Sequence, residues 1–512
     1  MTSLPAAACG LRAATRTTLA TPARSPSLLS RRCNASQASR TQQQTETVRE
    51  MGSLMAEVRG TLPQRIKVRM PTRLAPKRSW VNEVHAQPGD TRPIELTPEL
   101  EAELLKPKHM AESYVELWLP FRDDPELLEK YIATSGMVRL GKILEDLDTL
   151  AGAISYQHAL GAAPRAGDVS APLYIVTASV DRLDLLEPLR ADANYRLSGH
   201  VIYVGSSSME VFVSIERLDN LSGPAKVCLT GRAVAALRSF TMAARNASTL
   251  KSQKIAPLLV ETDAEKRLYA IGEGFKKRKR QEAATSLERV PPTKDEAVLL
   301  HSQYLEGLRA GLFSASDERH GGAATAAGAD QHLVPVSKTA LSATMHLHPQ
   351  QRNVHGKVFG GFLMRSAYEL AWMVAASFVH RQVQFLSLDA LSFHAPVPIG
   401  AILRLSSQVT YSDESGDAAN GKHAVAGVSV LAEVVNLETG VGSRSNTNDL
   451  TFRPSRLLLR HRRPRQFHFS FDVGPPTRRV MPQTYKEAME WIEGKRRVEL
   501  GHEMRALYGD GA

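Results

Sequence analysis

Asp148 and Asn353 are the two residues of this chain whose types and settings best suit the activation of a water molecule. A carboxylate can take a proton from water, and an amide can hold the same water by hydrogen bonds without adding charge. Asn353 opens the stretch NVHGKVFGG (353–361), and Asp148 follows the stretch GMVRLGKILED (136–146). Each stretch is a glycine turn that leads into an apolar helical pattern. We therefore treat them as candidate halves of one hydrolytic site.

The two stretches also align as an internal repeat, in which each half lacks the polar residue that the other half supplies. Ala133 stands where the second copy has Asn353, and Tyr368 stands where the first copy has Asp148. Neither side chain is a base or a water-binding amide. The repeat therefore predicts one productive site per chain, with the second position vestigial or used for binding. The aligned pairs are Gly136 with Gly356, Gly141 with Gly361, Asp148 with Tyr368, and Ala133 with Asn353.

The second turn ends where a helix is expected to start, and the unpaired N–H groups of a helix start favour negative charge. Glycines there let a substrate approach the backbone closely. We take the Gly361 amide as the oxyanion donor, a contribution of roughly 3–4 kcal/mol to catalysis. The predicted catalytic residues are Asp148, Asn353 and Gly361, and the predicted substrate-binding residues are His355, Gly356, Phe359 and Gly360.

Each of these residues also has a purely structural interpretation. Asn353 can be an N-terminal cap, and a glycine pair can serve the close packing of a helix on a sheet. Asp148 can be a solvated helix residue beside Glu145 and Asp146, and His355 can simply hydrogen-bond its own loop. The complementary losses in the two repeats favour the functional interpretation of Asp148 and Asn353.

The asparagine, the HG-x-x-F-GG turn and a helix bearing an aspartate resemble the active-site element of hotdog-fold acyl-CoA thioesterases. The longer segment RNVHGKVFGGFLMRSAYELAW (352–372), with SYVELWLPF from residue 113 and TYKEAMEWIEGKRR from residue 484, resembles the mitochondrial acyl-CoA thioesterase 9 family. The resemblance covers roughly residues 100–500. It implies an α+β fold of two tandem hotdog units, a catalytic pair at Asp148 and Asn353, and hydrolysis of acyl-CoA to a free fatty acid and CoA.

Strand-like segments follow the glycine turn and helix in each unit, marked by β-branched residues and approximate period-two alternation. They are residues 173–180, 195–204, 209–215 and 226–236 in the first unit, and 383–391, 402–411 and 424–435 in the second. Two helix-wrapping antiparallel sheets would pair edge to edge, which removes exposed sheet edges. The helix before the first set is apolar at positions 140, 144, 147, 151 and 154, so this face should pack on the sheet with Asp148 beside it.

The whole chain divides into six predicted segments. They are a transit peptide (1–45), an N-terminal extension (46–104), a first hotdog unit (105–245), a charged connector with helices and a Gly/Ala-rich insertion (246–334), a second hotdog unit (335–455), and a basic segment with a C-terminal helix (456–512).

The net charge of +11 is concentrated partly in the leader, where arginines and many Ser, Thr and Ala residues precede the first acidic residue, Glu46. This composition predicts a transit peptide for the mitochondrial matrix, with a plastid and a merely disordered tail as the alternatives. No apolar run approaches the roughly 18–20 residues that span a bilayer, so no membrane span is expected.

A run of five cations, Lys276 to Arg280, is a possible nuclear signal or nucleic-acid patch. No aromatic residues interleave with it, so a solvated helix face is favoured and no nucleic-acid partner is expected. The segment 460–465 is interpreted in the same way, and CoA phosphates are a third possible partner for either cluster. Acyl-CoA is the expected partner of the chain, which we expect to form a homo-oligomer.

No cofactor and no metal site are expected. His346, His348 and His355 lack a helical metal-binding spacing and cysteine partners. Cys9 and Cys33 would leave with the leader, and Cys228 is interpreted as a small buried hydrophobe.

Two other functions fit the same fold. A hotdog hydratase would need an aspartate and a histidine poised over the acyl β-carbon, and no Asp-x-x-x-x-His element is evident beside the helices. A non-catalytic acyl-CoA-binding protein is the second alternative, against which the retention of Asp148 and Asn353 argues. The preferred acyl chain length depends on the depth of the acyl pocket.

Overall fold

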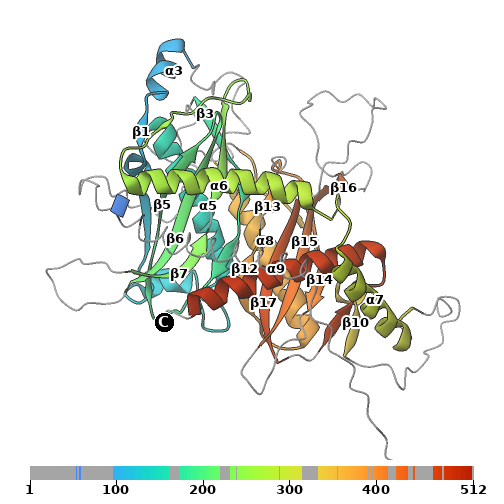
Figure 1. The fold of residues 1–512 in the computed structure, drawn as a ribbon. Coiled ribbons are helices and arrows are strands. Elements are labelled where there is room, and N and C mark those ends of the chain that lie inside the picture. The colour runs from blue at the N-terminus through green and yellow to red at the C-terminus, as the bar shows by residue number, and fades with distance from the viewer. Residues whose placement is uncertain are drawn as a thin grey trace, which may run out of the picture.

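The computed structural model describes residues 96–509 except for 162–171, 219–230, 238, 288, 314–331, 354–355, 390, 394–396, 413–422, 436–441, 444–464 and 476–477, together with Leu54, Glu57 and Val58. The predicted leader, His355, the three cysteines and the Gly/Ala-rich insertion lie outside these residues. In Figure 1 two units, each a helix wrapped by a sheet, stand side by side, and long helices cross their outer faces.

The first unit is built around α5 (Leu140–Leu160), whose apolar face packs inside an antiparallel sheet. Leu144, Leu147 and Ile154 of the predicted stripe are at most 2% exposed, which confirms that this face is buried. The strands are β2 (Val115–Leu119), β3 (Leu173–Val180), β4 (Leu183–Leu185), β5 (Asn194–Val204), β6 (Ser208–Leu218), β7 (Gly231–Leu237) and β8 (Phe240–Asn246).

The second unit repeats the plan around α8 (Gly360–Val379), an almost wholly apolar helix whose core side includes Leu363, Ala367 and Val374. Its strands are β11 (Leu341–His346), β12 (Gln384–Leu388), β13 (Leu391–Ser392), β14 (Ile402–Ser412), β15 (Ala424–Val435), β16 (Gly442–Ser443) and β17 (Arg465–Gly474). The two helices α5 and α8 pack directly on each other. This is the predicted tandem double hotdog.

The two sheets join edge to edge through a symmetric pair of strand contacts. Leu183 of β4 pairs with Leu388 of β12, and Val180 of β3 pairs with Leu391 of β13. The resulting sheet runs without a break from one unit into the other. The prediction of edge-to-edge pairing is therefore confirmed.

A buried arginine braces this junction. Arg182 Nε lies 2.9 and 2.8 Å from the two carboxylate oxygens of Asp184, and its Nη1 lies 2.5 Å from Asp389 Oδ1 in the other unit. Its Nη2 also donates to Ser387 Oγ. A buried guanidinium needs this many partners, because an unpaired buried charge is strongly destabilising. The network fixes how the two units meet.

Two long helices cover the outer faces of the sheets in equivalent ways. The helix α6 (Asp263–Thr285) lies on β5, and α9 (Tyr485–Gly509) lies on β14 (Figure 1). A Cβ added to Gly272 would lie 2.6 Å from Tyr203 Cβ, and one added to Gly494 would lie 2.6 Å from Tyr411 Cβ. Both helices therefore need glycine where they cross a tyrosine of the sheet.

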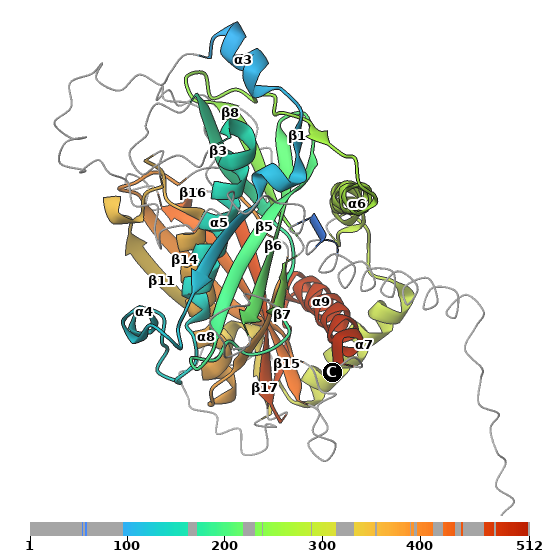
Figure 2. The same cartoon turned by 90° about the vertical axis from the view of Figure 1, so that its left-hand side faces the viewer.

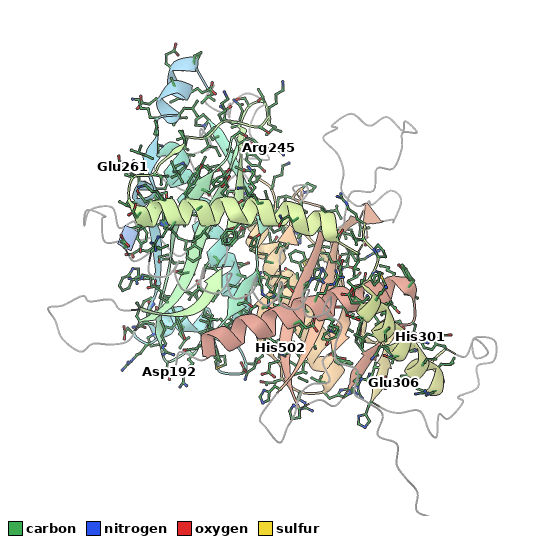
Figure 3. All side chains as sticks on the ribbon, viewed as in Figure 1. Asp192, Arg245, Glu261, His301, Glu306 and His502 are labelled. Carbon is green, nitrogen blue, oxygen red and sulfur yellow. The ribbon has the colours of Figure 1, made fainter. Side chains whose placement is uncertain are left out.

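The helix α7 (Lys294–Arg309) attaches to the second unit through ion pairs. Glu306, labelled in Figure 3, binds Arg479 at 2.6 Å, and Glu296 binds Arg496 of α9 at 2.6 Å. The remaining short elements are α3 (Pro98–Leu104), β1 (Lys108–His109), η2 (Met110–Ser113), α4 (Pro125–Glu129), β9 (Leu258–Leu259), β10 (Leu333–Pro335), η3 (Val336–Thr339), η4 (Pro349–Gln351) and β18 (Arg479–Met481).

The boundary predicted at residue 455 is wrong. β17 (Arg465–Gly474) pairs with both β12 and β15, so it is an internal strand of the second sheet. Its aromatic residues Phe467, Phe469 and Phe471 are at most 1% exposed. The basic run before this strand obscured its alternating pattern.

The cationic run on α6 is only partly the solvated face that we predicted. Lys277 is exposed, but Lys279 points to the sheet and binds Asp181 at 2.8 Å, Ser179 at 2.8 Å and Thr241 at 2.7 Å. Lys276 lies over the ring of Tyr203. Two of these cations thus hold the helix on its sheet. Among the described residues, no helix is long and apolar enough to cross a membrane.

Candidate active site

The turn that begins at Asn353 presents the start of α8. The Asn353 N–H donates to Lys357 O at 2.6 Å, the Gly356 N–H donates to Asn353 O at 3.1 Å, and the Asn353 side-chain oxygen accepts the Lys357 N–H at 3.1 Å. Gly356 has φ +68°, a conformation that favours glycine. The chain then runs through Phe359 into the helix.

The first unit builds the same turn without an asparagine. The Ala133 N–H donates to Met137 O at 2.8 Å, the Gly136 N–H donates to Ala133 O at 2.9 Å, and Gly136 has φ +80°. The turn therefore forms with alanine in place of the amide. The turn by itself therefore does not account for an asparagine at position 353.

Asp148 lies where the two units meet. It sits in the middle of α5 and is 3% exposed. The N–H of Gly361, in the first turn of α8, donates to Asp148 Oδ2 at 2.7 Å, and the Thr177 hydroxyl of β3 donates to Asp148 Oδ1 at 2.7 Å. The solvated interpretation of Asp148 is wrong. The structure brings the first unit's carboxylate to the glycine turn of the second unit, as the repeat predicts.

Burial raises the pKa of Asp148 to about 6. The hydrogen bonds from Thr177 and Gly361 oppose that rise because they stabilise the anion, and the nearby Glu145 carboxylate adds to it. Glu145 is itself neutralised by Lys142 and Arg365, each 3.1 Å away. A carboxylate with a pKa near 6 is deprotonated at neutral pH and is a stronger base than an ordinary aspartate.

The role predicted for the Gly361 amide needs correction. This N–H is already bonded to Asp148, so it holds the base in place and is not an open oxyanion donor. A Cβ on Gly361 would lie 2.8 Å from Glu145 Cα, and a Cβ on Gly360 would lie 2.9 Å from Asp148 Oδ2. The two glycines thus let α8 start directly against α5. Within the part of the chain that the structure describes, the Gly360 N–H makes no hydrogen bond.

Thr177 is a site residue that we did not predict from the sequence. The strands of the two units align with an offset of 208 residues, which pairs Asp181 with Asp389 and Pro188 with Pro396. The same offset pairs Thr177 with Phe385. Thr177 and Phe385 differ in the same way as Asp148 and Tyr368, with a polar residue in the first unit and an aromatic one in the second. This difference is visible in the sequence. The alternation of residues along the strand does not show which side chains point at α5.

The equivalent position in the second unit is filled by aromatic rings. Tyr368 lies 5.7 Å from Phe385, 6.0 Å from Phe469 and 6.3 Å from Phe471, centroid to centroid. Burial raises the pKa of its hydroxyl, so the group stays neutral. Beside it, Arg139 and Glu369 form an ion pair at 2.5 Å across the two helices. The residue that aligns with Asp148 is thus a neutral tyrosine and not a carboxylate.

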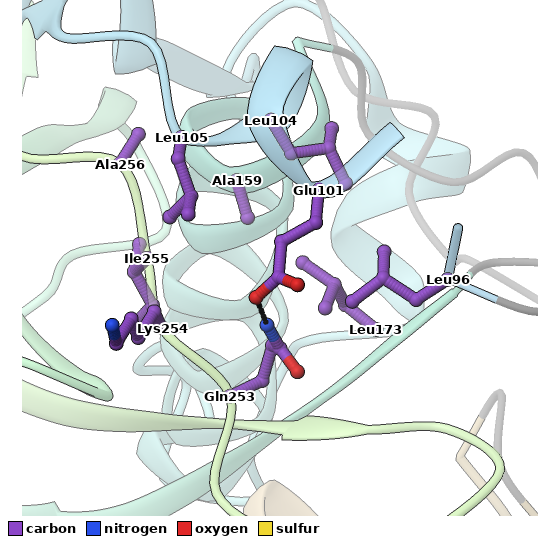
Figure 4. A pocket seen from close by; sticks show the side chains of 10 residues that line it. All are labelled: Leu96, Glu101, Leu104, Leu105, Ala159, Leu173, Gln253, Lys254, Ile255 and Ala256. Atoms are coloured by element: carbon purple, nitrogen blue, oxygen red, sulfur yellow. Dashed lines mark hydrogen bonds between the residues drawn. The ribbon is translucent and has the colours of Figure 1, made fainter. Parts of the chain in front are cut away.

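A pocket elsewhere in the first unit is separate from this site. It is lined by apolar side chains of α3 and β3 and by the segment 253–256, and Gln253 donates to Glu101 across it at 2.6 Å (Figure 4). The pocket touches α5 only at Ala159, three turns beyond Asp148, or roughly 16 Å along the helix axis. The pocket is therefore distant from Asp148.

Comparison with known proteins gives a consistent result. Human mitochondrial acyl-coenzyme A thioesterase 9 is 32% identical over 393 residues, which cover 77% of this chain and 78% of that protein. Acyl-coenzyme A thioesterase 4, mitochondrial, from Humulus lupulus is 32% identical over 77% of this chain and 68% of its own length. No protein-family model matches the chain.

A Staphylococcus aureus acyl-CoA hydrolase, solved with butyryl coenzyme A, is 19% identical and has a TM-score of 0.27, covering 35% of this chain and 95% of that one. The identity to the human protein extends over most of both chains. This chain therefore belongs to the acyl-coenzyme A thioesterase 9 family.

Proposed function

We propose that the chain hydrolyses acyl-CoA thioesters to a free fatty acid and CoA at one composite site per chain. The observation that carries the proposal is the contact between Asp148 of the first unit and the Gly361 amide of the second, in a site whose counterpart is filled by Tyr368. A buried carboxylate with raised basicity, held at a helix start, suits the activation of water.

In this mechanism Asp148 takes a proton from a water molecule that Asn353 helps to hold. The water oxygen attacks the thioester carbonyl carbon, and negative charge moves to the carbonyl oxygen. We assign the Gly360 N–H as the donor to that oxygen, in place of Gly361. The intermediate collapses with cleavage of the C–S bond, and the CoA thiolate recovers a proton from Asp148 or from solvent. No metal or cofactor is required at any step.

The direct test is to measure release of the free CoA thiol from acyl-CoA substrates over a series of chain lengths. We expect turnover by the full chain, and the series identifies the preferred acyl length. Acyl-CoA binding without thiol release would instead support the non-catalytic alternative. Hydration of an enoyl-CoA without thiol release would support the hydratase alternative.

Thr177→Val should shift the pH dependence of hydrolysis. The substitution removes one hydrogen bond to the charged form of Asp148, so the pKa of that carboxyl should rise further above 6. A hydrogen bond to a charged group contributes about 1.5–3 kcal/mol, or roughly 1–2 pKa units. We expect the acidic limb of the kcat profile to move to higher pH by about that amount, and kcat at pH 7 to fall.

Thr177→Ser is the matched control, because serine keeps the hydroxyl and loses only a methyl group. Its acidic limb should stay close to that of the native chain. An unshifted limb in Thr177→Val would remove Thr177 from the site, and equal shifts in both variants would point to packing rather than to the hydrogen bond.

The aromatic counterpart should tolerate the loss of its hydroxyl. Tyr368→Phe keeps the ring contacts with Phe385, Phe469 and Phe471, and kcat should stay within a few fold of the native value. Steady-state thiol release measures this. A collapse of kcat in a folded Tyr368→Phe protein would mean that the productive site is at the other interface.

For cellular location, we propose the mitochondrial matrix, with a plastid as the alternative. The composition of residues 1–45 and the mitochondrial names of the human and mouse relatives support the first, and a chloroplastic relative from Humulus lupulus supports the second. A fluorescent fusion of the full chain tests the assignment, and retention in the cytosol would contradict both.

A further inference from the structure

The strand β11 forms one outer edge of the sheet. Among the described strands its one partner is β14, in an unbroken antiparallel register from Leu341 with Ser407 to His346 with Ile402. Figure 2 shows β11 at the margin of the sheet, beside β14. Within the described part of the chain, nothing pairs with the other side of β11.

This edge is much more exposed than its counterpart in the first unit. β2 is the outermost strand there, and four of its five residues are buried. In β11 four of the six residues are exposed and none is buried, and Leu341 is 40% exposed. The sequence LSATMH contains no lysine, glutamate or proline, and its register with β14 has no bulge. These are the devices that normally protect a sheet edge from pairing.

The two faces of β11 have different characters. Ala343 and Met345 pack on the core, opposite the buried Leu405 and Leu403 of β14. Leu341 is two residues before Ala343 and therefore lies on the same face of the strand. Ser342 and Thr344 lie on the outer face and are exposed. The strand thus offers apolar side chains on one face, hydroxyl groups on the other, and an edge with which no other described strand pairs.

We propose that β11 pairs antiparallel with β11 of a second copy of this chain, about a twofold axis at Ala343. In this register Leu341 of one copy lies opposite Met345 of the other on the inner face, and Ser342 lies opposite Thr344 on the outer face. The inner pair is apolar and the outer pair can hydrogen-bond, so each cross-strand pair is favourable. The same contacts occur twice, as a twofold interface requires.

The self-complementary register is the reason to favour a second copy over a foreign peptide. Any extended peptide could use the backbone edge, but β11 matches itself on both faces at once and without charge repulsion. The pairing would extend the sheet across two double-hotdog chains. It is independent of the proposed hydrolysis, because Asp148 and Gly361 belong to the same chain.

Two double variants at the same exposed positions test the pairing and its register. Ser342→Lys with Thr344→Lys places like charges opposite each other twice, and we expect self-association weakened about tenfold or more. Ser342→Lys with Thr344→Glu places lysine opposite glutamate, and association should return to the native level. Sedimentation velocity or light scattering of the full chain measures both. The control is Ala297→Lys with Ser302→Lys at two exposed positions of α7, which should leave association unchanged.

A disulfide gives a second readout. Ala343→Cys places two thiols across the axis, and oxidation should yield a covalent dimer. Ser342→Cys places its thiols out of register, beyond the roughly 7 Å between Cα atoms that a disulfide can bridge, and should not cross-link. A native chain that stays monomeric, or an oligomer whose mass the double-lysine variant leaves unchanged, would overturn the proposal. In the second case a different surface joins the copies. Neither result bears on hydrolysis, which thiol release per chain measures independently.

Discussion

Replacing Asp148 by asparagine is expected to lower kcat for thioester hydrolysis by roughly 10²- to 10⁴-fold, the range of a lost general base. Asparagine keeps the size of the side chain but cannot take a proton. Its oxygen can still accept the Gly361 N–H, and its amide group can donate to the Thr177 hydroxyl, so the local structure should persist. Thiol release measures the loss, and acyl-CoA binding by titration calorimetry should remain.

The same substitution should not destabilise the fold at neutral pH. The pKa of Asp148 is raised from 3.8 to about 6 in the folded chain, so between these values the folded state binds a proton that the unfolded state has released. Stability therefore falls as pH rises through this window, by up to about 3 kcal/mol for this one group. The asparagine variant lacks that loss, so its Tm should equal or exceed the native Tm at pH 7.5, with the advantage shrinking toward pH 4.

Near-native kcat in a folded Asp148→Asn chain would refute the general-base mechanism. For the native chain, kcat should fall about tenfold per pH unit below pH 6, because the protonated carboxyl cannot accept a proton. Asn353→Ala should also lower kcat. If both residues act on one water, the double variant should lose less than the two separate losses combined.

Replacing Gly361 by alanine should cause a comparably large loss for a different reason. The added Cβ would lie 2.8 Å from Glu145 Cα, a backbone atom that cannot turn aside, and 2.6 Å from the Phe359 ring. The start of α8 must then move away from α5, and the bond from the Gly361 N–H to Asp148 is lost. We expect about 1–3 kcal/mol of destabilisation from overpacking and a loss of kcat beyond tenfold.

The repeat supplies a matched control in Gly141→Ala. There the added Cβ would meet Arg365 Cγ at 2.7 Å, and that long side chain can move. Gly141 also lies at the second interface, where Tyr368 stands in place of an aspartate. Thermal unfolding should show a smaller loss than Gly361→Ala, and kcat should stay within a few fold. Equal losses of kcat in the two variants would show that general packing between α5 and α8, and not the contact with Asp148, controls activity.

The sequence alone determined the parts of the fold that depend on local pattern. The strands at 173–180 and 424–435 match β3 and β15 in full, because β-branched alternation is a local property. The repeat also identified Asp148, since a residue that is polar in one copy and aromatic in the other is visible without a structure. The last strand of the second sheet was missed, because a basic run precedes it and its pairing partners are distant in the chain.

Only the tertiary structure decided how the site residues are used. The sequence suggested that the Gly361 amide would serve the substrate, but the packing of α8 on α5 gives it to Asp148. The Thr177 hydroxyl became part of the site because the twist and register of β3 turn that side chain toward α5. Directions of side chains across an interface depend on packing between distant segments. The pattern of residues along a chain fixes which elements form, and their docking fixes which groups meet.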